Sequence, residues 1–326
     1  MNIRILSNGD IFTKRPEWRE PGRSDYLAMY SSVFDGVVID PALMVIPIDD
    51  HIINRGDGIF EYIPVHNGYA YCFEAHLTRL QKSAEVISLD LPFNIDIIRQ
   101  ITLGTVAISS AKCCGVRLFI SRGLGDFSCD PTTPGKSILY IIVLKEPALP
   151  NRPPEGVTAM TTHVPVKPSI YAQVKTTCYL LNALVQLEAH RNYVQYGFWY
   201  DQEGHLTESS IDNVAIVTQD KILKYPNYDC MLKGTGLIRA VELAKELVKS
   251  GELNGICQAD ISQHEVYESS EILVLGSGDA FPVINYDGRV IGNGKPGQIF
   301  YRIWELLTKD RLEGPNEVRT PIPYSL

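Results

Sequence analysis

A glycine-threonine-glycine sequence at residues 234–236 has the composition of an anion site, and phosphate is the anion it would suit. It lies between a strand-like run and a predicted helix. Its glycines would let backbone N–H groups approach a ligand closely, and a helix start adds unpaired donors and the positive end of the helix dipole. Glycine also borders many helices for conformational reasons alone, so this feature needs support from other residues.

Several other patterns lack the context that their usual function requires. Residues 291–297 read IGNGKPG and contain GxGxxG, but the chain ends too soon for the strands and acidic residue of a dinucleotide site. A turn before a helix at 298–307 is the simpler interpretation. The seven histidines show no metal-ligand spacing, and the sequence has no GxSxG elbow of a serine hydrolase. We therefore expect no metal and no serine nucleophile.

Four further segments, together with the glycine-threonine-glycine sequence, resemble the class IV pyridoxal-phosphate-dependent aminotransferases. They are GDGIFE (56–61), EAHLTRLQKSA (74–84), QVKTTCYLLNAL (173–184) and LTESSIDNVAIV (206–217). The family includes D-amino-acid aminotransferases, branched-chain aminotransferases and aminodeoxychorismate lyases. The resemblance covers residues 29–297 and looks closest to the plant-type D-amino-acid aminotransferases. It implies the α/β (α+β) architecture of a fold-type IV homodimer, with the cofactor at the junction of two α/β domains.

The resemblance also implies roles for individual residues. Lys175 would carry pyridoxal 5'-phosphate and move a proton from the substrate Cα, which requires an unprotonated amine and therefore a desolvated site. Glu208 would pair with the pyridine nitrogen and keep it protonated, so that the ring can accept electrons. Arg79 would grip the phosphate through two charge-assisted hydrogen bonds. The other expected cofactor contacts are Tyr179, for which a place in the core is the alternative, and Ser210, Asn213, Gly234, Thr235 and Gly236.

Substrate contacts are expected from residues outside the cofactor set. Phe60 and Glu61 would line the pocket, although both also suit a structural role in a strand. Bacterial D-amino-acid aminotransferases hold the substrate carboxylate with an Arg-x-His pair, which the corresponding segment SRGLGDFSCDP (121–131) lacks. The candidates for this task are Arg122, Ser277, Gly278 and backbone N–H groups of the loop at 276–280.

The chain departs from the family pattern at three points within these segments. The threonine of the phosphate loop, Thr235, is displaced by one position. Ser209 follows the glutamate where a glycine is usual, and Asp212 stands where a small or neutral residue is common.

The first hypothesis for the activity is transamination between a D-amino acid and a 2-oxo acid through a Lys175 aldimine. An aminodeoxychorismate lyase and a branched-chain L-amino-acid aminotransferase would share the cofactor site, so the sequence leaves both open. A protein that carries the cofactor without catalysis is the alternative from another class. The presence of both Lys175 and Glu208 argues against it.

Mixed α and β elements are predicted to position these residues. Apolar runs at 59–65 and 69–73 flank Asn67-Gly68 and predict a hairpin. Apolar spacing predicts helices at 74–89, 178–193 (with Leu180, Ala183, Leu184 and Leu187 on one face) and 236–249 (with Leu237, Val241, Ala244 and Val248 inward), and Asn94 would cap another. Further strands are expected at 116–121, 138–144, 157–164, 197–200, 205–208, 213–217, 222–225 and 271–275.

Length and composition suit a two-domain globular protein, with 326 residues of which 45% are hydrophobic. Four prolines within 146–156 predict a connection between domains, with a long surface loop inside one domain as the alternative. The connection gives a smaller N-terminal domain (1–148), a linker (149–156) and a larger C-terminal cofactor domain (157–326). The acidic segment 310–317 is expected to be a solvated tail.

Charge and cysteine content limit the partners and the compartment. A net charge of −8 argues against nucleic acid and anionic membranes, and the longest apolar run, 138–144, is shorter than the roughly 20 residues that a membrane helix needs. The seven scattered cysteines form no CxxC pair, and the first residues lack the apolar core of an export signal. We therefore expect free thiols, a cytoplasmic location, and small-molecule amino acid and 2-oxo acid substrates.

Overall fold

The computed structural model describes residue 9 and residues 23–324 of the chain. The N-terminal residues considered above for an export signal lie almost entirely outside this range. The chain divides into two compact units, which are described separately. Unit 1 comprises residues 1–70, 88–148 and 321–326, and unit 2 comprises residues 71–87 and 149–320.

Unit 1 is built on an antiparallel sheet in which strands follow the order β4-β3-β5-β6-β1-β2. Its bounds are β1 (Tyr26–Ser31), β2 (Gly36–Val38), β3 (Gly58–His66), β4 (Tyr69–Tyr71), β5 (Cys114–Ser121) and β6 (Ile138–Lys145). The predicted hairpin is confirmed, because β3 and β4 pair across Asn67 and Gly68. Both turn residues have positive φ, at 51° and 81°, as the tight turn of a two-residue hairpin requires.

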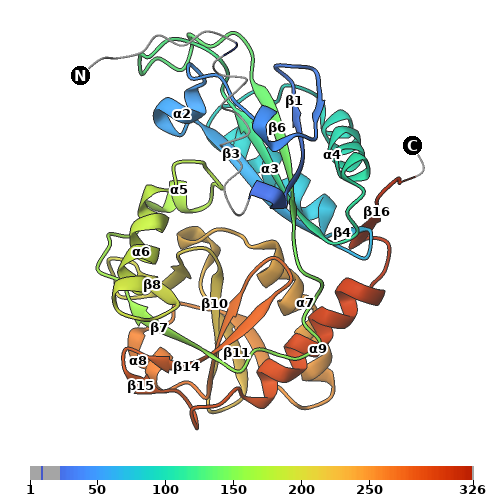
Figure 1. Ribbon diagram of the computed structural model, residues 1–326. Coiled ribbons are helices and arrows are strands. Elements are labelled where there is room, and N and C mark those ends of the chain that lie inside the picture. Colours follow the sequence, from blue (N-terminus) through green and yellow to red (C-terminus); the bar gives the residue numbers. More distant parts are fainter. Residues whose placement is uncertain (1–8, 10–22, 325–326) are drawn as a thin grey trace. The chain divides into compact units, whose positions relative to one another are not determined.

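Helices complete unit 1. They are η2 (Arg23–Asp25), η3 (Pro41–Leu43), α2 (His51–Arg55) and α4 (Ile95–Ser109). The predicted cap of α4 is confirmed, since Asn94 Oδ1 accepts the Ile97 N–H at 2.9 Å. The helix lies against β1 and β6 (Figure 1), and buries Ile98 and Val106 there.

Unit 2 is built on a mixed sheet of nine strands in the order β12-β11-β10-β13-β14-β7-β8-β9, with β15 paired to β14. The strand β9 also pairs with β10, so six strands (β9, β8, β7, β14, β13 and β10) close into a ring of pairings. The bounds are β7 (Val157–Thr161), β8 (Tyr196–Tyr200), β9 (Leu206–Ser209), β10 (Asn213–Val217), β11 (Ile222–Tyr225), β12 (Gly255–Gln258), β13 (Glu271–Leu275), β14 (Ala280–Tyr286) and β15 (Arg289–Val290). The short strand β16 (Arg319–Pro321) is not part of this sheet; it is the edge strand next to β4 in the sheet of unit 1.

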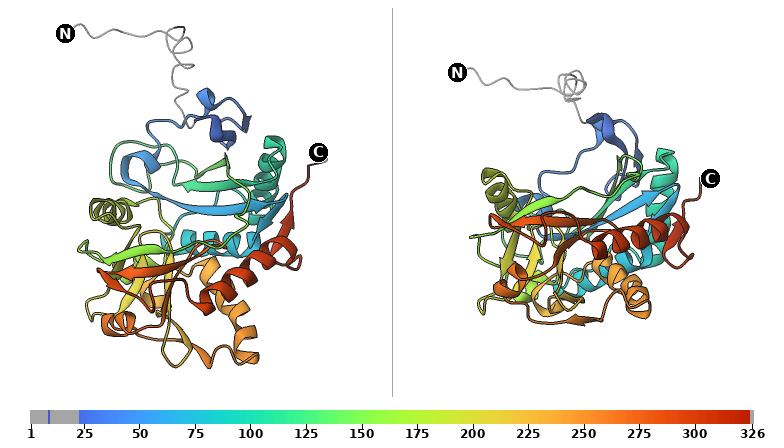
Figure 2. Two further views of the ribbon diagram at one scale, coloured as in Figure 1. Left: turned by 60° about the horizontal axis from the view of Figure 1, so that its bottom comes forward. Right: turned by 90° about the horizontal axis from the view of Figure 1, so that it is seen from below.

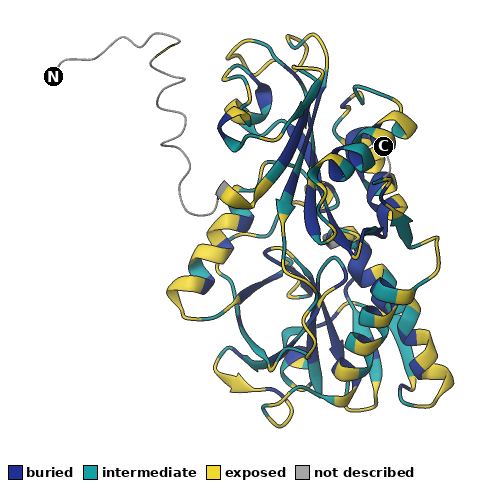
Figure 3. Cartoon of the chain, turned by 45° about the vertical axis from the view of Figure 1, so that its right-hand side comes forward, coloured by how far each residue is buried: buried dark blue, intermediate teal, exposed yellow. Residues whose placement is uncertain are grey.

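Unit 2 also contains helices. They are α3 (Phe73–Val86), α5 (Ser169–Ala172), α6 (Leu180–Arg191), η4 (Tyr228–Cys230), α7 (Thr235–Lys249), α8 (Gln263–Tyr267) and α9 (Gln298–Glu313). Of these, α6, α7 and α9 pack against the sheet of unit 2. The helices α7 and α9 lie side by side (Figure 2) and share one apolar core with β10, β11 and β13. Buried residues concentrate on the strands, whereas the helices alternate between buried and exposed faces (Figure 3).

The apolar faces of two helices in unit 2 have different surroundings, and the expected inward residues of α7 require correction. The apolar face of α6 points to solvent in this chain, where Leu180, Leu184 and Leu187 are 67%, 40% and 42% exposed. The helix instead buries Asn182, Val185 and Ala189. In α7, the buried stripe is Leu237, Ala240, Ala244 and Leu247, one position away from the predicted Val241 and Val248.

The segment at 310–317 is not simply a solvated tail, because its first residues belong to α9 and are buried. Asp310 is 6% exposed and accepts hydrogen bonds from Tyr71 at 2.7 Å and from Arg239 at 2.8 and 2.6 Å. Arg311 is 2% exposed and donates to Asp279 at 2.6 Å. Charges that are paired in this way can be buried, and sequence alone does not reveal the partners.

The units differ from the expected domains 1–148 and 157–326 in two segments. Residues 71–87, which include α3, belong to unit 2, and residues 321–326 belong to unit 1. Among the described residues, no helix combines the length and the apolar composition of a membrane span. The same residues contain no group of three His, Cys, Asp or Glu side chains arranged to bind a metal ion.

Candidate functional site

Most of the predicted cofactor residues lie around two adjoining cavities in unit 2. The first is lined by Arg79, Lys175, Glu208 and Asn213, by residues 234–236 and by Ser277. The second is lined by Lys175, Tyr179, Glu208 and Ser210. The cavities are small, about 30 and 20 Å³, and Lys175, Glu208, Ile211 and Leu232 line both.

Glu208 is fixed by the pairing of β9 with β10, which places it opposite Asn213. Its side chain is 7% exposed. One carboxylate oxygen accepts a hydrogen bond from the Lys167 ammonium at 2.7 Å, and the other accepts the Leu232 N–H at 3.1 Å. The carboxylate is thus held in one orientation at the boundary of both cavities.

Lys175 lies in the loop before α6. Its backbone N–H donates to Ser83 Oγ of α3 at 3.3 Å. Its Nζ lies 6.0 Å from the centroid of the Tyr179 ring, at the N-terminal end of α6. The amine and the phenol that the sequence singled out therefore face the same cavity.

Asp212 brings a further acidic side chain to Lys175. Burial raises the pKa of its carboxyl to about 6; the Lys175 ammonium opposes this shift, and the Asp279 and Glu208 carboxylates add to it. The turn between β9 and β10 fixes Asp212, because its N–H donates to Ser209 Oγ at 3.0 Å and its carbonyl accepts the Ser209 N–H at 2.9 Å. The departure from the family pattern at position 212 thus places an acid beside the lysine amine.

The start of α7 forms a cup in which glycine is required by close approach. A Cβ on Gly234 would lie 1.8 Å from Asn213 Oδ1, and a Cβ on Gly236 would lie 1.4 Å from the Gly276 carbonyl oxygen. Neither clash can be relieved without moving the backbone or Asn213. The cup therefore exists because these two positions lack side chains.

Arg79 reaches this cup from α3. Its Nη1 donates to the Lys233 carbonyl at 3.2 Å, and its Nη2 lies 3.4 Å from His76 Nδ1. The other nitrogen of His76 lies 3.3 Å from Thr235 Oγ1. His76 is fully buried, so it connects the guanidinium to the first residue of α7.

Ser210 and Asn213 support the walls of the cavities. Ser210 donates to Gln186 Oε1 at 2.9 Å, and its carbonyl accepts from Asn182 at 2.5 Å. Asn213 donates to the Leu232 carbonyl at 2.9 Å. These contacts tie the β9–β10 turn to α6 and to the segment that leads to α7.

The loop at 276–280 borders the cup on the other side. Ser277 lines the first cavity. Gly278 has φ of +94°, and a Cβ there would lie 3.0 Å from both Tyr71 and Arg311. Asp279 pairs with the buried Arg311, which anchors the loop to α9.

Three predicted substrate residues lie in unit 1. Phe60 and Glu61 are consecutive residues of β3, so their side chains point to opposite faces of the sheet. Phe60 stacks on Phe119 with ring centroids 5.8 Å apart, and Glu61 is fully buried. The Phe60 and Glu61 side chains therefore cannot both line one cavity on the same face of this sheet.

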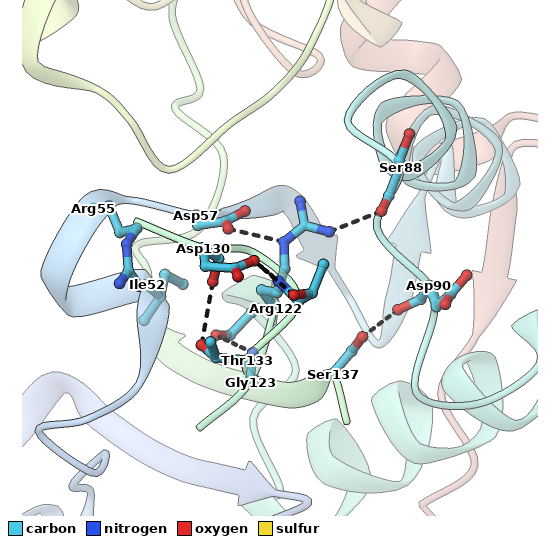
Figure 4. A network of polar contacts seen from close by, with 12 residues as sticks. Ile52, Arg55, Asp57, Ser88, Asp90, Arg122, Gly123, Asp130, Thr133 and Ser137 are labelled. Atoms are coloured by element: carbon cyan, nitrogen blue, oxygen red, sulfur yellow. Dashed lines mark hydrogen bonds and ion pairs between the residues drawn. The ribbon is translucent and has the colours of Figure 1, made fainter. Parts of the chain in front are cut away.

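Arg122 follows β5 and is engaged in a polar network of unit 1 (Figure 4). Its Nε donates to Asp57 Oδ2 at 2.8 Å, and its Nη1 donates to the Ser88 carbonyl at 2.8 Å. The side chain is 15% exposed. The guanidinium thus joins the residue before β3 to the start of the segment that follows α3.

Three residues that the structure brings to the site carry a partial signal in the sequence or none. His76 lies three positions before Arg79 in a predicted helix, which places both on one face. Asp212 was recognised only as a departure from the family pattern. Lys167 lies in a loop between two prolines, and no motif marks it.

Comparisons with known proteins agree with this arrangement. The model of the family "Amino-transferase class IV" matches residues 58–286. The chain is 37% identical over 325 residues to the D-amino-acid transaminase, chloroplastic, of Arabidopsis thaliana, which covers 99% of this chain and 86% of that protein. It is 28% identical over 274 residues to a putative branched-chain-amino-acid aminotransferase of Methanocaldococcus jannaschii, covering 83% and 93%.

A solved structure has the same fold. It is that of a branched-chain amino acid aminotransferase from Thermoproteus uzoniensis with norvaline, with a TM-score of 0.78 over 91% of this chain and 99% of that chain. At 22% sequence identity, this match concerns the fold alone.

Proposed function

Because the chain belongs to the class IV aminotransferases, we propose that it is a pyridoxal-phosphate-dependent transaminase of fold type IV that moves an amino group between a D-amino acid and a 2-oxo acid. The substrate class is supported by the nearly full-length similarity to a protein named D-amino-acid transaminase. The observation that carries the mechanism is the convergence of Lys175 and Glu208 on the same two cavities.

The residues around the cavities fit pyridoxal 5'-phosphate. The cup at 234–236 offers backbone donors and the positive end of α7, and Arg79 adds a cation at its rim. Thr235, Asn213 and Ser277 supply further polar groups. This end of the site has the chemistry of a phosphate site, and Glu208 at the other side has that of a partner for a protonated ring nitrogen.

When bound, the cofactor supplies an aldehyde for covalent linkage to an amine and a ring that accepts electrons from the substrate Cα. Lys175 Nζ would hold the cofactor through that linkage, and the same amine would act as the general base and acid that takes the proton from the substrate Cα. Tyr179, which lines the same cavity as Lys175, would donate its hydroxyl to the phenolic oxygen. The Glu208 carboxylate would accept a hydrogen bond from the ring nitrogen and so keep that nitrogen protonated.

Substrate carboxylate recognition is proposed for Ser277 and the backbone N–H groups of the loop at 276–280. This assignment follows from the place of Ser277 on the first cavity and from the anchoring of the loop by Asp279 and Arg311. The guanidinium of Arg122 already bonds to Asp57 and Ser88 within unit 1, so we give it a structural role there. Gly278 would allow the loop to turn close to the site.

Branched-chain L-amino-acid transamination is the second candidate. It is favoured by the similarity to the relative from Methanocaldococcus jannaschii, whose name gives that activity to that protein. The two activities share the same lysine and cofactor, and they differ in the face and the side-chain pocket that the substrate uses.

We also propose a homodimer and a cytoplasmic location. Leu180, Leu184 and Leu187 expose an apolar stripe on α6, which supports association with another copy. The six cysteines whose side chains are described are free thiols, as expected in a reducing compartment. Sedimentation equilibrium of the purified chain tests the first proposal, and a monomer at micromolar concentration would contradict it.

The activity is tested by spectroscopy and by a substrate panel. The purified protein should absorb visible light from a cofactor that borohydride fixes to Lys175, and Lys175→Ala should lose this absorbance. Lys233→Ala, which alters a lysine at the edge of the cup, is the control and should keep it. D-amino acids with 2-oxo acid acceptors should then turn over faster than L-leucine, L-isoleucine and L-valine. Absence of any linkage at Lys175 would refute the mechanism, and a preference for L-substrates would favour the second candidate.

A further inference from the structure

Lys167 forms a nearly buried ion pair with Glu208, although nothing in the sequence marked it. The ammonium lies 2.7 Å from Glu208 Oε1, and the two side chains are 14% and 7% exposed. Ion pairs of this kind are uncommon, because removing two charges from water is unfavourable unless the geometry is good. The pair lines the second cavity together with Lys175 and Tyr179.

The loop that carries Lys167 is well positioned. It connects β7 to α5, and its Val164 carbonyl accepts the Trp199 indole N–H at 2.9 Å. Pro168 follows Lys167 and restricts its backbone to extended conformations. The ammonium also lies 5.1 Å from the centroid of the Trp199 ring, a fully buried side chain whose face attracts cations. The position of the charge is therefore set by the fold.

The second oxygen of Glu208 has its own donor, the Leu232 N–H at 3.1 Å. With Lys167 on one oxygen and Leu232 on the other, the plane of the carboxylate is fixed. A carboxylate has about four lone-pair positions, so it can still accept one more hydrogen bond. A protonated ring nitrogen would donate its hydrogen bond to this remaining acceptor position of Glu208.

A proton shared between Glu208 and a ring nitrogen has two possible positions. It can lie on the nitrogen, leaving a carboxylate, or on the carboxylate, leaving a neutral ring. The Lys167 ammonium contacts the Glu208 carboxylate directly. A ring nitrogen bound to the other side of that carboxylate would lie farther from the ammonium. Because Coulomb interactions decrease with distance, the cation stabilises the anionic carboxylate more than it destabilises the more distant cationic ring.

We infer that Lys167 is a positioning residue that holds Glu208 as an oriented anion and thereby keeps the shared proton on the ring nitrogen of the cofactor. This inference rests on the proposed function. It adds to that function a residue that touches Glu208 and does not touch the reacting atoms.

The test uses the full-length protein reconstituted with pyridoxal phosphate labelled with ¹⁵N in the ring. The ring-nitrogen chemical shift reports protonation directly and does not depend on turnover. The wild type should give the value of a protonated pyridine. Lys167→Gln should move the shift toward that of an unprotonated pyridine, and Lys167→Arg, which keeps the cation, should stay near the wild-type value.

A matched control is available in the same unit. Lys224 pairs with Glu265 at 2.9 Å, and its side chain is 23% exposed, but neither residue lines the two cavities. Lys224→Gln should leave the ring-nitrogen shift unchanged. If Lys167→Gln does not fold, Lys167→Met removes the ammonium while keeping an unbranched side chain that suits a mostly buried position.

The outcomes separate the inference from the proposed function. A wild type with no cofactor linked to Lys175 would sink the proposed function and the inference with it. A linked cofactor whose ring-nitrogen shift is the same in the wild type and in the Lys167 variant without the cation, Lys167→Gln or Lys167→Met, would overturn the inference alone. An equal displacement in Lys224→Gln would also overturn it, because the effect would then not be specific to the Glu208 pair.

Discussion

Asp212→Asn should stabilise the cofactor-free protein at neutral pH. Burial raises the pKa of the Asp212 carboxyl from its ordinary 3.8 to about 6, so ionisation of this side chain opposes folding. Asparagine has a similar size and carries no charge. It should therefore remove the electrostatic penalty while keeping the shape of the β9–β10 turn.

The sign and the magnitude follow from proton binding. Between pH 4 and pH 6, the folded state binds more protons at Asp212 than the unfolded state does. The stability that this proton binding contributes is fully present below about pH 4 and is lost as the pH rises through 6. A shift of two units corresponds to roughly 3 kcal/mol, and partial exposure of the side chain reduces this to about 1–3 kcal/mol. For 326 residues, an unfolding entropy of about 0.7 kcal/mol/K converts this range into a rise in Tm of about 2–4 °C.

Urea unfolding between pH 4 and pH 8 measures the effect. The difference in unfolding free energy between Asp212→Asn and the wild type should be near zero at pH 4 and reach its full value above pH 6. Asp220→Asn, at an exposed position of the same unit, is the control and should show no such pH dependence. A difference that is constant with pH, or a destabilisation at pH 7, would refute the reasoning.

Three further predictions concern the cup and the buried charges. Gly236→Ala should weaken binding of pyridoxal phosphate at least tenfold in a titration, because its Cβ would lie 1.4 Å from the Gly276 oxygen; Gly104→Ala, with no atom within 4 Å, should bind like the wild type. Arg122→Ala should lower the free energy of unfolding by about 1–3 kcal/mol in a urea titration and leave KM for the amino acid unchanged, whereas a higher KM without loss of stability would indicate carboxylate binding. Asp310→Ala removes the partner of the buried Tyr71 hydroxyl and of the partly exposed Arg239, and should destabilise the protein by about 1–3 kcal/mol in the same assay; a loss below about 0.5 kcal/mol would show that the pair is solvated.

Local sequence determined most of the elements. The Asn67-Gly68 turn adopts the positive φ values that its residues favour, and Asn94 caps α4 as its side chain allows. These features depend on neighbours a few residues apart, so a single sequence contains the information. The resemblance to the class IV family indicated Lys175 and Glu208 through their motifs. The cup at 234–236 was indicated by glycines that precede a predicted helix.

The tertiary structure decided the partners of the charges and the direction of the helix faces. The Lys167 and Glu208 pair joins residues 41 positions apart, and the Arg239 and Asp310 pair joins residues 71 positions apart. Both helices have apolar residues at helical spacing, but Leu184 of α6 is exposed to solvent and Ala240 of α7 lies in the core. Periodicity shows that a helix has an apolar face, but only the packing of strands distant in sequence determines what that face meets and which charges are buried together.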